Sequence, residues 1–158
     1  MASPTQVDPR VVSLWRLQRM VRLCLFVTPA GAVGGFFVGQ SAGATLGLMF
    51  TAAFIGFHAL MVLIWPPLEY RNLAYTVRDE DLMVESGVLF HSWSAIPYTR
   101  IQHVDTRQGP LERIFGLQRL AVYTAAGMHA DGSIPGLHAD VAIALRDDLS
   151  RRGGDDGV

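Results

Sequence analysis

The chain has 158 residues, enough for one compact domain of about 100 residues together with a membrane anchor. Half of the residues are hydrophobic and only 17% are charged, against roughly 25% in soluble domains, so part of the surface is expected to face lipid. The net charge of −1 argues against nucleic-acid binding, and the single cysteine, Cys24, excludes an intramolecular disulfide.

Residues 1–22 form a basic N-terminal arm with a net charge of +3. Its basic residues are Arg10, Arg16, Arg19 and Arg22. The spacing of three between the last three arginines, with Leu and Val on another face, predicts a helix. This helix either lies in the cytoplasmic interface of the membrane or forms the first turns of a longer helix. We expect Arg16, Arg19 and Arg22 to be the residues that contact anionic lipid.

Two uncharged apolar stretches follow, residues 23–39 and 46–65, joined by six small or polar residues. Each stretch can cross about 30 Å of hydrocarbon at about 1.5 Å per residue, so residues 23–67 are predicted to be a transmembrane helical hairpin. Arginines flank the pair, and the connection has none, which predicts a multi-pass protein of the cell membrane with both termini cytoplasmic. A cleaved signal peptide is the competing interpretation of the first stretch.

Aromatic residues and prolines mark the expected limits of this hairpin. Trp15 and Trp65 are expected at the level of the lipid headgroups. Pro66 and Pro67 are expected to end the second helix, because proline lacks an amide donor and clashes with the preceding turn. Pro29 is expected to kink the first helix.

Small residues and one histidine distinguish the apolar stretches. Glycines recur at a spacing of four in the first stretch, as Gly31, Gly35 and Gly39, and Gly56 follows Ala52 at the same spacing in the second. Such residues are expected to pack the two helices together, with contact to a second copy or a partner as the alternative. His58 is the candidate polar residue at membrane depth, with either a functional role or a neutral hydrogen bond to the neighbouring helix.

Residues 70–150 are predicted to form a cytoplasmic, mostly β domain, which makes the whole chain an α+β membrane protein. Strands are expected at 73–77 and 82–85, as a hairpin around an acidic turn, at 92–96 and 101–106, as a second pair, and at 120–124 and around Ile134. A helical turn is expected at 111–115, and a closing helix with an apolar stripe of Val141, Leu145 and Leu149 at 139–151. This order suggests a partly open β-barrel or bent sheet capped by the helix. The tail, residues 151–158, is predicted to be disordered.

Several segments carry a family resemblance, among them LAYTVRDEDLMVESGVL, IPYTRIQHVDTRQGPLERIFGLQRLAVYTAAG and IPGLHADVAIAL. They resemble bPH2, the bacterial pleckstrin-homology (PH)-like domain of small membrane proteins of the YdbS type, over about residues 73–149. The motif positions are Pro97, Arg100, Ile101, Gln102, Gln108, Gly109, Arg113, Gly116, Thr124 and Gly136. The resemblance implies the PH-like fold, and most of these positions are expected to be structural. PH-like domains bind many unrelated partners, so no particular ligand is implied.

No enzyme signature is found. Hydrolase elbows, phosphate loops and paired metal-ligand motifs are missing, so we expect no catalytic residue, cofactor or metal. The histidines of the domain are scattered: His91, His103, His129 and His138. A set of Ser94, His103 and Asp105 lacks the geometry of a triad, because the last two share one strand face.

The predicted function is a non-enzymatic adaptor. It would bind a protein partner, or its own copies, through an exposed strand edge or a groove beside the closing helix. From Arg71 onward the chain has 9 Arg against 12 Asp and Glu, a net charge of −3, which argues against general adhesion of the domain to anionic lipid. The alternative is a lipid- or small-ligand-sensing module, and a third hypothesis is a component of a membrane enzyme or transporter centred on His58.

Overall fold

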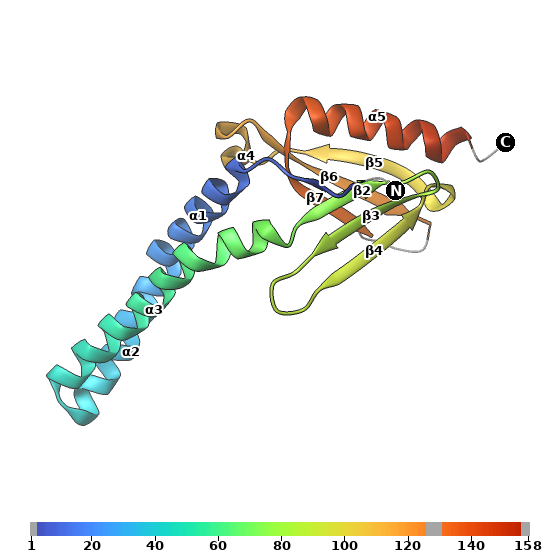
Figure 1. Cartoon of the computed structure of the whole chain (residues 1–158). Helices are drawn as coiled ribbons and strands as arrows, with labels where there is room; N and C mark the ends of the chain where they lie inside the picture. Colours follow the sequence, from blue (N-terminus) through green and yellow to red (C-terminus); the bar gives the residue numbers. More distant parts are fainter. Residues whose placement is uncertain (1–2, 126–130, 156–158) are drawn as a thin grey trace. The chain divides into compact units, whose positions relative to one another are not determined.

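The computed structural model describes residues 3–125 and 131–155, and the chain divides into two units. The β unit comprises Met1–Leu14 and Leu68–Val158, and the helical unit comprises Trp15–Pro67. The two units are described separately below, with the same element labels in both (Figure 1).

The β unit contains two antiparallel sheets (Figure 1). The first has the order β1 (Thr5–Gln6), β2 (Ala74–Val77), β3 (Asp81–Ser86) and β4 (Ser92–Pro97). The second has the order β5 (Ile101–Arg107), β6 (Leu117–Thr124) and β7 (Gly132–His138). The short helix η2 (Tyr98–Arg100) joins the sheets, α4 (Pro110–Ile114) joins β5 to β6, and α5 (Ala139–Asp155) ends the described chain.

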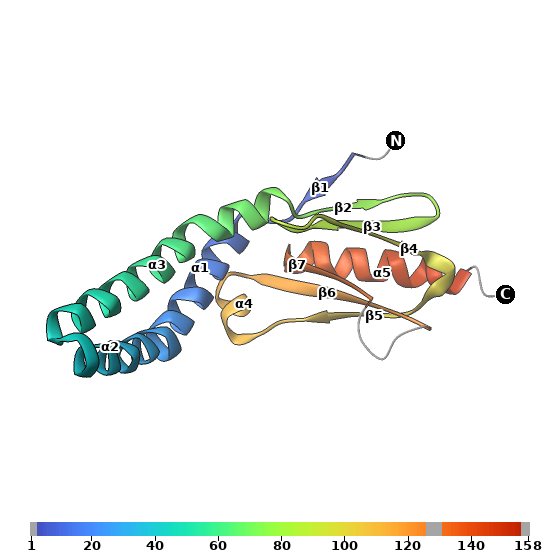
Figure 2. The same ribbon diagram turned by 90° about the horizontal axis from the view of Figure 1, so that it is seen from below.

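One apolar core lies between the two sheets and α5, which packs against η2 and the strands of the second sheet (Figures 1 and 2). Its buried side chains include Leu82, Val84, Ile96, Val104, Leu120, Val122, Ile134, Ala142, Leu145 and Leu149. The sheets touch directly where a Cβ at Gly132 would collide with the side chain of Ile96. Strand β3 alternates buried and more exposed side chains, as the strand period predicts, whereas β6 buries Leu120, Ala121 and Val122 in succession.

The first residues of the chain are part of the β unit, in contrast to the separate arm that we predicted. Thr5 pairs with Tyr75 in the first sheet, and Val7 and Val11 are buried. The amide of Asp8 donates a hydrogen bond of 2.9 Å to the carbonyl of Gly136. The strand and the first helical turn bury apolar side chains that a helix lying in the membrane interface would have turned toward lipid.

The helical unit is a pair of long helices. The first runs without interruption through α1 (Arg10–Arg22), the π-helical segment η1 (Leu23–Val27) and α2 (Thr28–Ala42), so the arm is the beginning of a longer helix. The π-helical segment lies just before Pro29, where the missing amide donor disturbs the hydrogen-bond ladder. Only Gly43, with a φ of 102°, separates α2 from α3 (Ala44–Arg71).

Three expectations from the sequence were wrong: two concern helix boundaries and one concerns a strand pairing. Pro66 and Pro67 lie inside α3, which continues to Arg71 and ends where the side chain of Asn72 donates to the carbonyl of Leu68. A connection was predicted at residues 40–45, but only a single residue of it lies outside the helices. The small residues on either side of that residue belong to α2 or α3. The second strand pair was also wrong, because β4 pairs with β3 and β5 pairs with β6.

The closing helix is longer than predicted, and its buried stripe differs from the predicted one at one position. Helix α5 reaches Asp155, and Arg151 and Arg152 support its last turns through ion pairs of 3.3 and 2.9 Å with Asp148. The disordered tail was therefore wrong for residues 151–155, and residues 156–158 lie outside the described chain. Val141 is exposed, and Ala142 replaces it in the buried stripe.

We predict that Gly136→Ala lowers the free energy of unfolding of the β unit by about 2 kcal/mol or more. Gly136 has a φ of 73°, and an added Cβ would collide with the side chain of Val11. Gly116→Ala is the matched control, because its φ is 68° but nothing lies within 4 Å of the added carbon. Chemical denaturation in detergent, followed by circular dichroism, measures both losses. Equal losses would show that the contact with Val11 contributes nothing.

Candidate functional site

The family-motif residues around α4 hold the connection between β5 and β6. The side-chain amide of Gln108 donates 2.9 Å to the carbonyl of Leu117, and the amide of Gly109 donates 2.6 Å to the carboxylate of Glu112. Glu112 is buried and lies 3.6 Å from the guanidinium of Arg119. These contacts cap the first turn of α4 and fix where β6 begins.

The motif residues before α4 mark the passage from one sheet to the other. Pro97 ends β4, and Ile101 is buried at the start of β5. Arg100 and Gln102 beside them, and Arg113 on α4, have exposed side chains. The arrangement brings the apolar residue into the core and leaves the polar ones at the surface of the β unit.

The remaining motif residues lie at strand ends. Both the amide and the hydroxyl of Thr124 donate to one carboxylate oxygen of Asp131, at 3.1 and 2.5 Å, which joins the ends of β6 and β7. The carbonyl of Gly116 accepts the amide of Ala139 at 3.2 Å. Like the contact of Gly136 described above, these interactions are internal to the β unit.

The glycines of α2 lie against α3 in the helical unit. A Cβ at Gly35 would collide with the hydroxyl of Thr51, and one at Gly31 would come within 2.9 Å of the ring of Phe54. Thr51 donates its hydroxyl to the carbonyl of Gly31 at 3.2 Å and to the carbonyl of Gly47, in its own helix, at 3.0 Å. Gly39 also faces Gly47, so small residues from both helices allow the backbones to approach closely.

Gly56 does not take part in this packing, in contrast to our prediction. It is exposed, and nothing lies within 4 Å of a Cβ added to it. The face of α3 that meets α2 instead follows Gly47, Thr51 and Ile55, so Gly56 is turned by about 100° from the contact. Gly47, which we had not selected, takes its place.

A basic hollow of about 350 Å³ lies between the two helices of the helical unit. Its lining residues are Arg19, Arg22, Leu23, Val27, His58, Met61, Val62 and Trp65. The hollow thus brings together two of the three predicted lipid-contacting arginines with the candidate polar residue of the second helix. Arg16 is exposed on α1 and does not line it. Cationic groups beside an apolar wall suit an anionic headgroup with an acyl chain.

His58 contributes an aromatic ring to this hollow. Its Nδ1 lies 2.9 Å from the carbonyl of Phe54 one turn earlier, and its ring centroid lies 4.5 Å from that of the Phe54 ring. This hydrogen bond lies within α3 and orients the ring, in place of the expected hydrogen bond to the neighbouring helix.

The considered hydrolytic set is divided between the sheets. His103 and Asp105 are exposed on β5, with Nε2 and Oδ2 3.8 Å apart, whereas Ser94 belongs to β4. The ring of His103 stacks on Tyr123 at 4.3 Å, and Arg107 donates to the Tyr123 hydroxyl. Within the described residues, no group of three or more His, Cys, Asp and Glu side chains is placed to hold a metal, and His129 lies outside them.

Strand β4 is an outer edge of the first sheet. Of its side chains, Trp93 and Ala95 are exposed and Ile96 is buried. At its end, the hydroxyl of Tyr98 donates 2.7 Å to the carbonyl of Arg78. Burial raises the pKa of Tyr98 above its ordinary value, while the nearby guanidinium of Arg152 opposes the shift. This end of the strand is therefore fixed in place by uncharged tyrosine at neutral pH.

Two sets of residues were missed in the sequence. The first is the wall of the basic hollow: His58 and Trp65 were named singly, but their helical spacing with Val62, which could have identified a shared face, was not recognised. The second set is the loop between β3 and β4, where Leu89 and Phe90 are highly exposed. An uncharged loop with large apolar residues, where turn residues are usual, was the available signal.

The fold joins a PH-like domain of two antiparallel sheets and a closing helix to a pair of long apolar helices. Residues 26–153 match the family described as "Bacterial PH domain", and the chain belongs to this family. The resemblance found in the sequence is confirmed.

Two relatives carry names that describe a membrane protein. The UPF0699 transmembrane protein YdbS of Bacillus subtilis (strain 168) is 32% identical over 150 residues, which cover 92% of this chain and 90% of the relative. The UPF0699 transmembrane protein YdbT of the same organism is 33% identical over 82 residues, 49% of this chain but only 17% of that longer relative. Neither name is that of an enzyme, and no solved structure matches the chain at a significant level.

We predict that Gly47→Ala weakens the helical pair by about 1–3 kcal/mol, because the added methyl group would collide with the carbonyl of Gly35. Gly56→Ala is the control, because its added carbon meets nothing. Thermal denaturation of the two purified variants in one mild detergent compares them. A loss in Gly56→Ala as large as that in Gly47→Ala would contradict this packing.

Proposed function

We propose that the chain is a non-enzymatic adaptor whose β unit binds a protein partner, or a second copy of the chain, along the edge of β4. The observation that carries the proposal is the composition of this edge. Over its six residues, SWSAIP, β4 has no charged side chain. An unpaired strand edge presents backbone donors and acceptors that another strand can complete.

The other sheet edges among the described residues have the features that prevent strand addition. Strand β1 has only two residues, and β7 has Pro135 in its interior, whereas the proline of β4, Pro97, is its last residue. Strand β5 has an ion-pair cluster on its surface, with Arg107 3.9 Å from Asp105. Strand β4 is distinguished from all three, which supports it as the docking edge.

We place the helical unit across the cell membrane and both of its ends on the cytoplasmic side. Arg10–Ala42 and Ala44–Arg71 are long and apolar enough to cross a bilayer, and only 11% of each apolar stretch is buried in the structure. A core helix of a soluble protein would be mostly buried. Residues 5–14 and 68–155 form one folded unit, which requires the chain to return to the side it left. The flanking arginines support the cytoplasmic side.

A photo-cross-linking amino acid at Ala95 tests the docking edge in native membranes. We expect one adduct of discrete mass, identified by mass spectrometry, and no such adduct from the same amino acid at Ser150, an exposed position on α5. Expression of untagged chain together with tagged chain distinguishes a second copy from another protein.

A lysine on the edge provides the matched variant. In a chain without the cross-linking amino acid, Ala95→Lys is expected to lower the amount of partner retained about tenfold, because a charge on an edge strand opposes pairing. Ser150→Lys is expected to leave retention unchanged. Equal adducts at both cross-linking positions, or full retention by Ala95→Lys, would refute the docking edge.

A second candidate function, recognition of an anionic lipid, is favoured by the basic hollow. Arg19, Arg22 and His58 line one hollow with an apolar wall. Each basic residue near an anionic surface contributes about 1 kcal/mol, so two arginines can enrich such a lipid noticeably. The β unit has a net negative charge and adds nothing to this attraction.

We predict that Arg22→Gln lowers the amount of anionic phospholipid that co-purifies with the chain by about fivefold, about 1 kcal/mol. Arg16→Gln removes the same charge two turns earlier, outside the hollow, and is expected to retain the lipid. Quantitative lipid analysis after purification in mild detergent measures both. The same loss in the two variants would indicate general attraction to the membrane surface and would exclude a specific site.

A further inference from the structure

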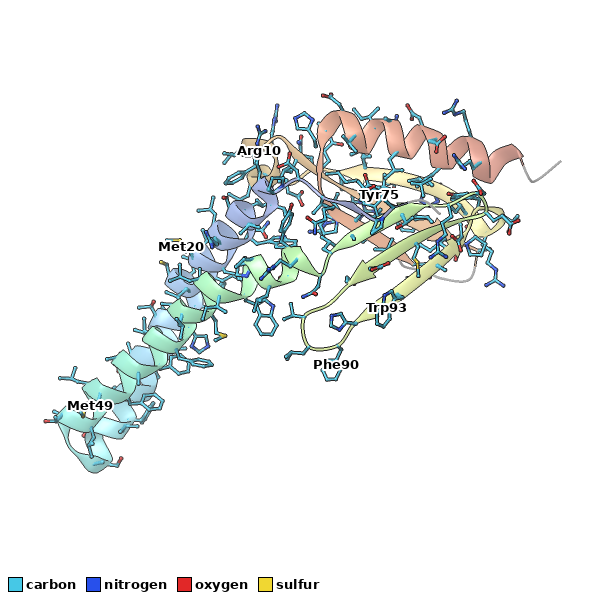
Figure 3. All side chains as sticks on the ribbon, in the orientation of Figure 1. Arg10, Met20, Met49, Tyr75, Phe90 and Trp93 are labelled. Atoms are coloured by element: carbon cyan, nitrogen blue, oxygen red, sulfur yellow. The ribbon has the colours of Figure 1, made fainter. Side chains whose placement is uncertain are left out.

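The turn from β3 into β4 carries an uncharged cluster, the apolar tip, formed by Leu89 and Phe90 of the loop and Trp93 of β4. Their exposed fractions are 73%, 88% and 62%. Phe90 is more exposed than any large hydrophobic side chain described in the apolar helices, the highest of which is Leu48 at 72%. Figure 3 shows Phe90 at the outer end of the loop. Residues of this size exposed to water are costly unless something covers them.

The strand register places the apolar tip at a particular end of the first sheet. Ala74, the first residue of β2, pairs with Glu85 on one side and with Gln6 on the other. Glu85 also pairs with Trp93 on its other side, and Leu89 and Phe90 lie in the turn beyond Ser86, so the tip is at the same end of the sheet as Ala74. Three elements meet there: the end of β1, the beginning of β2 and the apolar tip.

This end of the sheet is where the chain enters and leaves the apolar helices. Helix α3 ends at Arg71, three residues before Ala74, and α1 begins at Arg10, four residues after Gln6. Three extended residues span at most about 10 Å. The tip is therefore at the end of the β unit that is tethered most closely to the membrane segments.

The opposite end of the same sheet has the opposite character. The turn between β2 and β3 contains Asp79 and Glu80, both exposed, next to Asp81. Acidic side chains are repelled by the anionic inner surface of a bacterial membrane. The sheet thus has an uncharged aromatic end beside its tethers and an acidic end away from them.

We propose that the apolar tip inserts into the headgroup region of the bilayer and holds the β unit against the membrane. Aromatic side chains favour this region, where the ring is partly dehydrated and the polar edge stays hydrated. The ring of Trp93 stacks with that of His91 at 5.8 Å, which presents two flat polar-edged rings beside Phe90. Insertion involves the loop and Trp93, and it leaves the backbone of β4 after Trp93 accessible to a partner strand.

Tethering makes a small loop sufficient for this contact. A loop of three apolar residues binds membranes weakly on its own, but a tethered loop meets the surface at a high effective concentration. The proposal rests on the proposed crossing of the membrane by the helical unit, and the experiment below tests the two separately.

The experiment uses the full chain in vesicles of phosphatidylcholine and phosphatidylglycerol, with fewer than one copy per vesicle. In a Cys24→Ser background, Ser92→Cys places an environment-sensitive fluorophore beside the intact tip, and Glu80→Cys places it at the acidic end. Lipids with a quencher near the headgroup are expected to reduce emission about twofold at position 92 and not at position 80. Phe90→Asp in the Ser92→Cys chain is expected to abolish the quenching, with unchanged thermal denaturation as the control for folding.

The outcomes separate the proposal from its competitors. Equal emission at position 92 in vesicles with and without the quencher lipid would overturn it, and so would quenching that survives Phe90→Asp. Quenching that needs many copies per vesicle would show that the tip contacts a second copy. Shielding of the fluorophore from water that appears only after addition of a membrane extract would show that the tip contacts another protein. A fluorophore on Cys24 of the natural chain, quenched by lipids labelled deep in the acyl chain, checks the membrane crossing independently.

Discussion

The short pairing of β1 with β2 is the interaction on which the arrangement of the chain depends. It joins Thr5 to Tyr75, across both apolar helices, and Val11 then packs against Gly136 on the last strand. The β unit is complete only when both ends of the helical pair return to the same place. A chain in which only one helix crossed the bilayer would leave β1 and β2 on opposite sides and could not close this sheet. If the helical unit crosses the bilayer as proposed, folding of the β unit is thus coupled to correct insertion.

The same pairing explains which features could be predicted from the sequence. Local patterns were sufficient for the apolar helices, the hairpin of β2 and β3 and the family-motif turns, because each depends on neighbouring residues. The role of residues 5–14 could not be predicted, because Val7 and Val11 are buried by segments more than 60 positions away in sequence. The pairing of β4 and β5 failed for a related reason: strands that follow one another were assumed to pair, whereas η2 sends them to different sheets.

The candidate sites show the same division. Arg19, Arg22 and His58 were selected singly for their charge or polarity, but only the packing of the two helices places them around one hollow. The glycines of α2 were identified correctly by spacing, whereas Gly56 failed because spacing within a helix does not show which face meets the neighbour. The family motif was easy to recognise, yet its residues maintain the fold, and the apolar tip and all of the proposed docking edge except Pro97 lie outside it.

The connection through Gly43 alone limits where a signal can reach this protein. With the helical unit across the bilayer as proposed, almost no chain emerges on the outer surface of the cell membrane. A soluble molecule outside the cell would find neither a domain to bind nor a loop to cleave. Whatever the protein responds to must then arrive from the cytoplasm or through the lipid itself, for example as a change in bilayer composition or thickness, to which a helical pair of fixed length is sensitive.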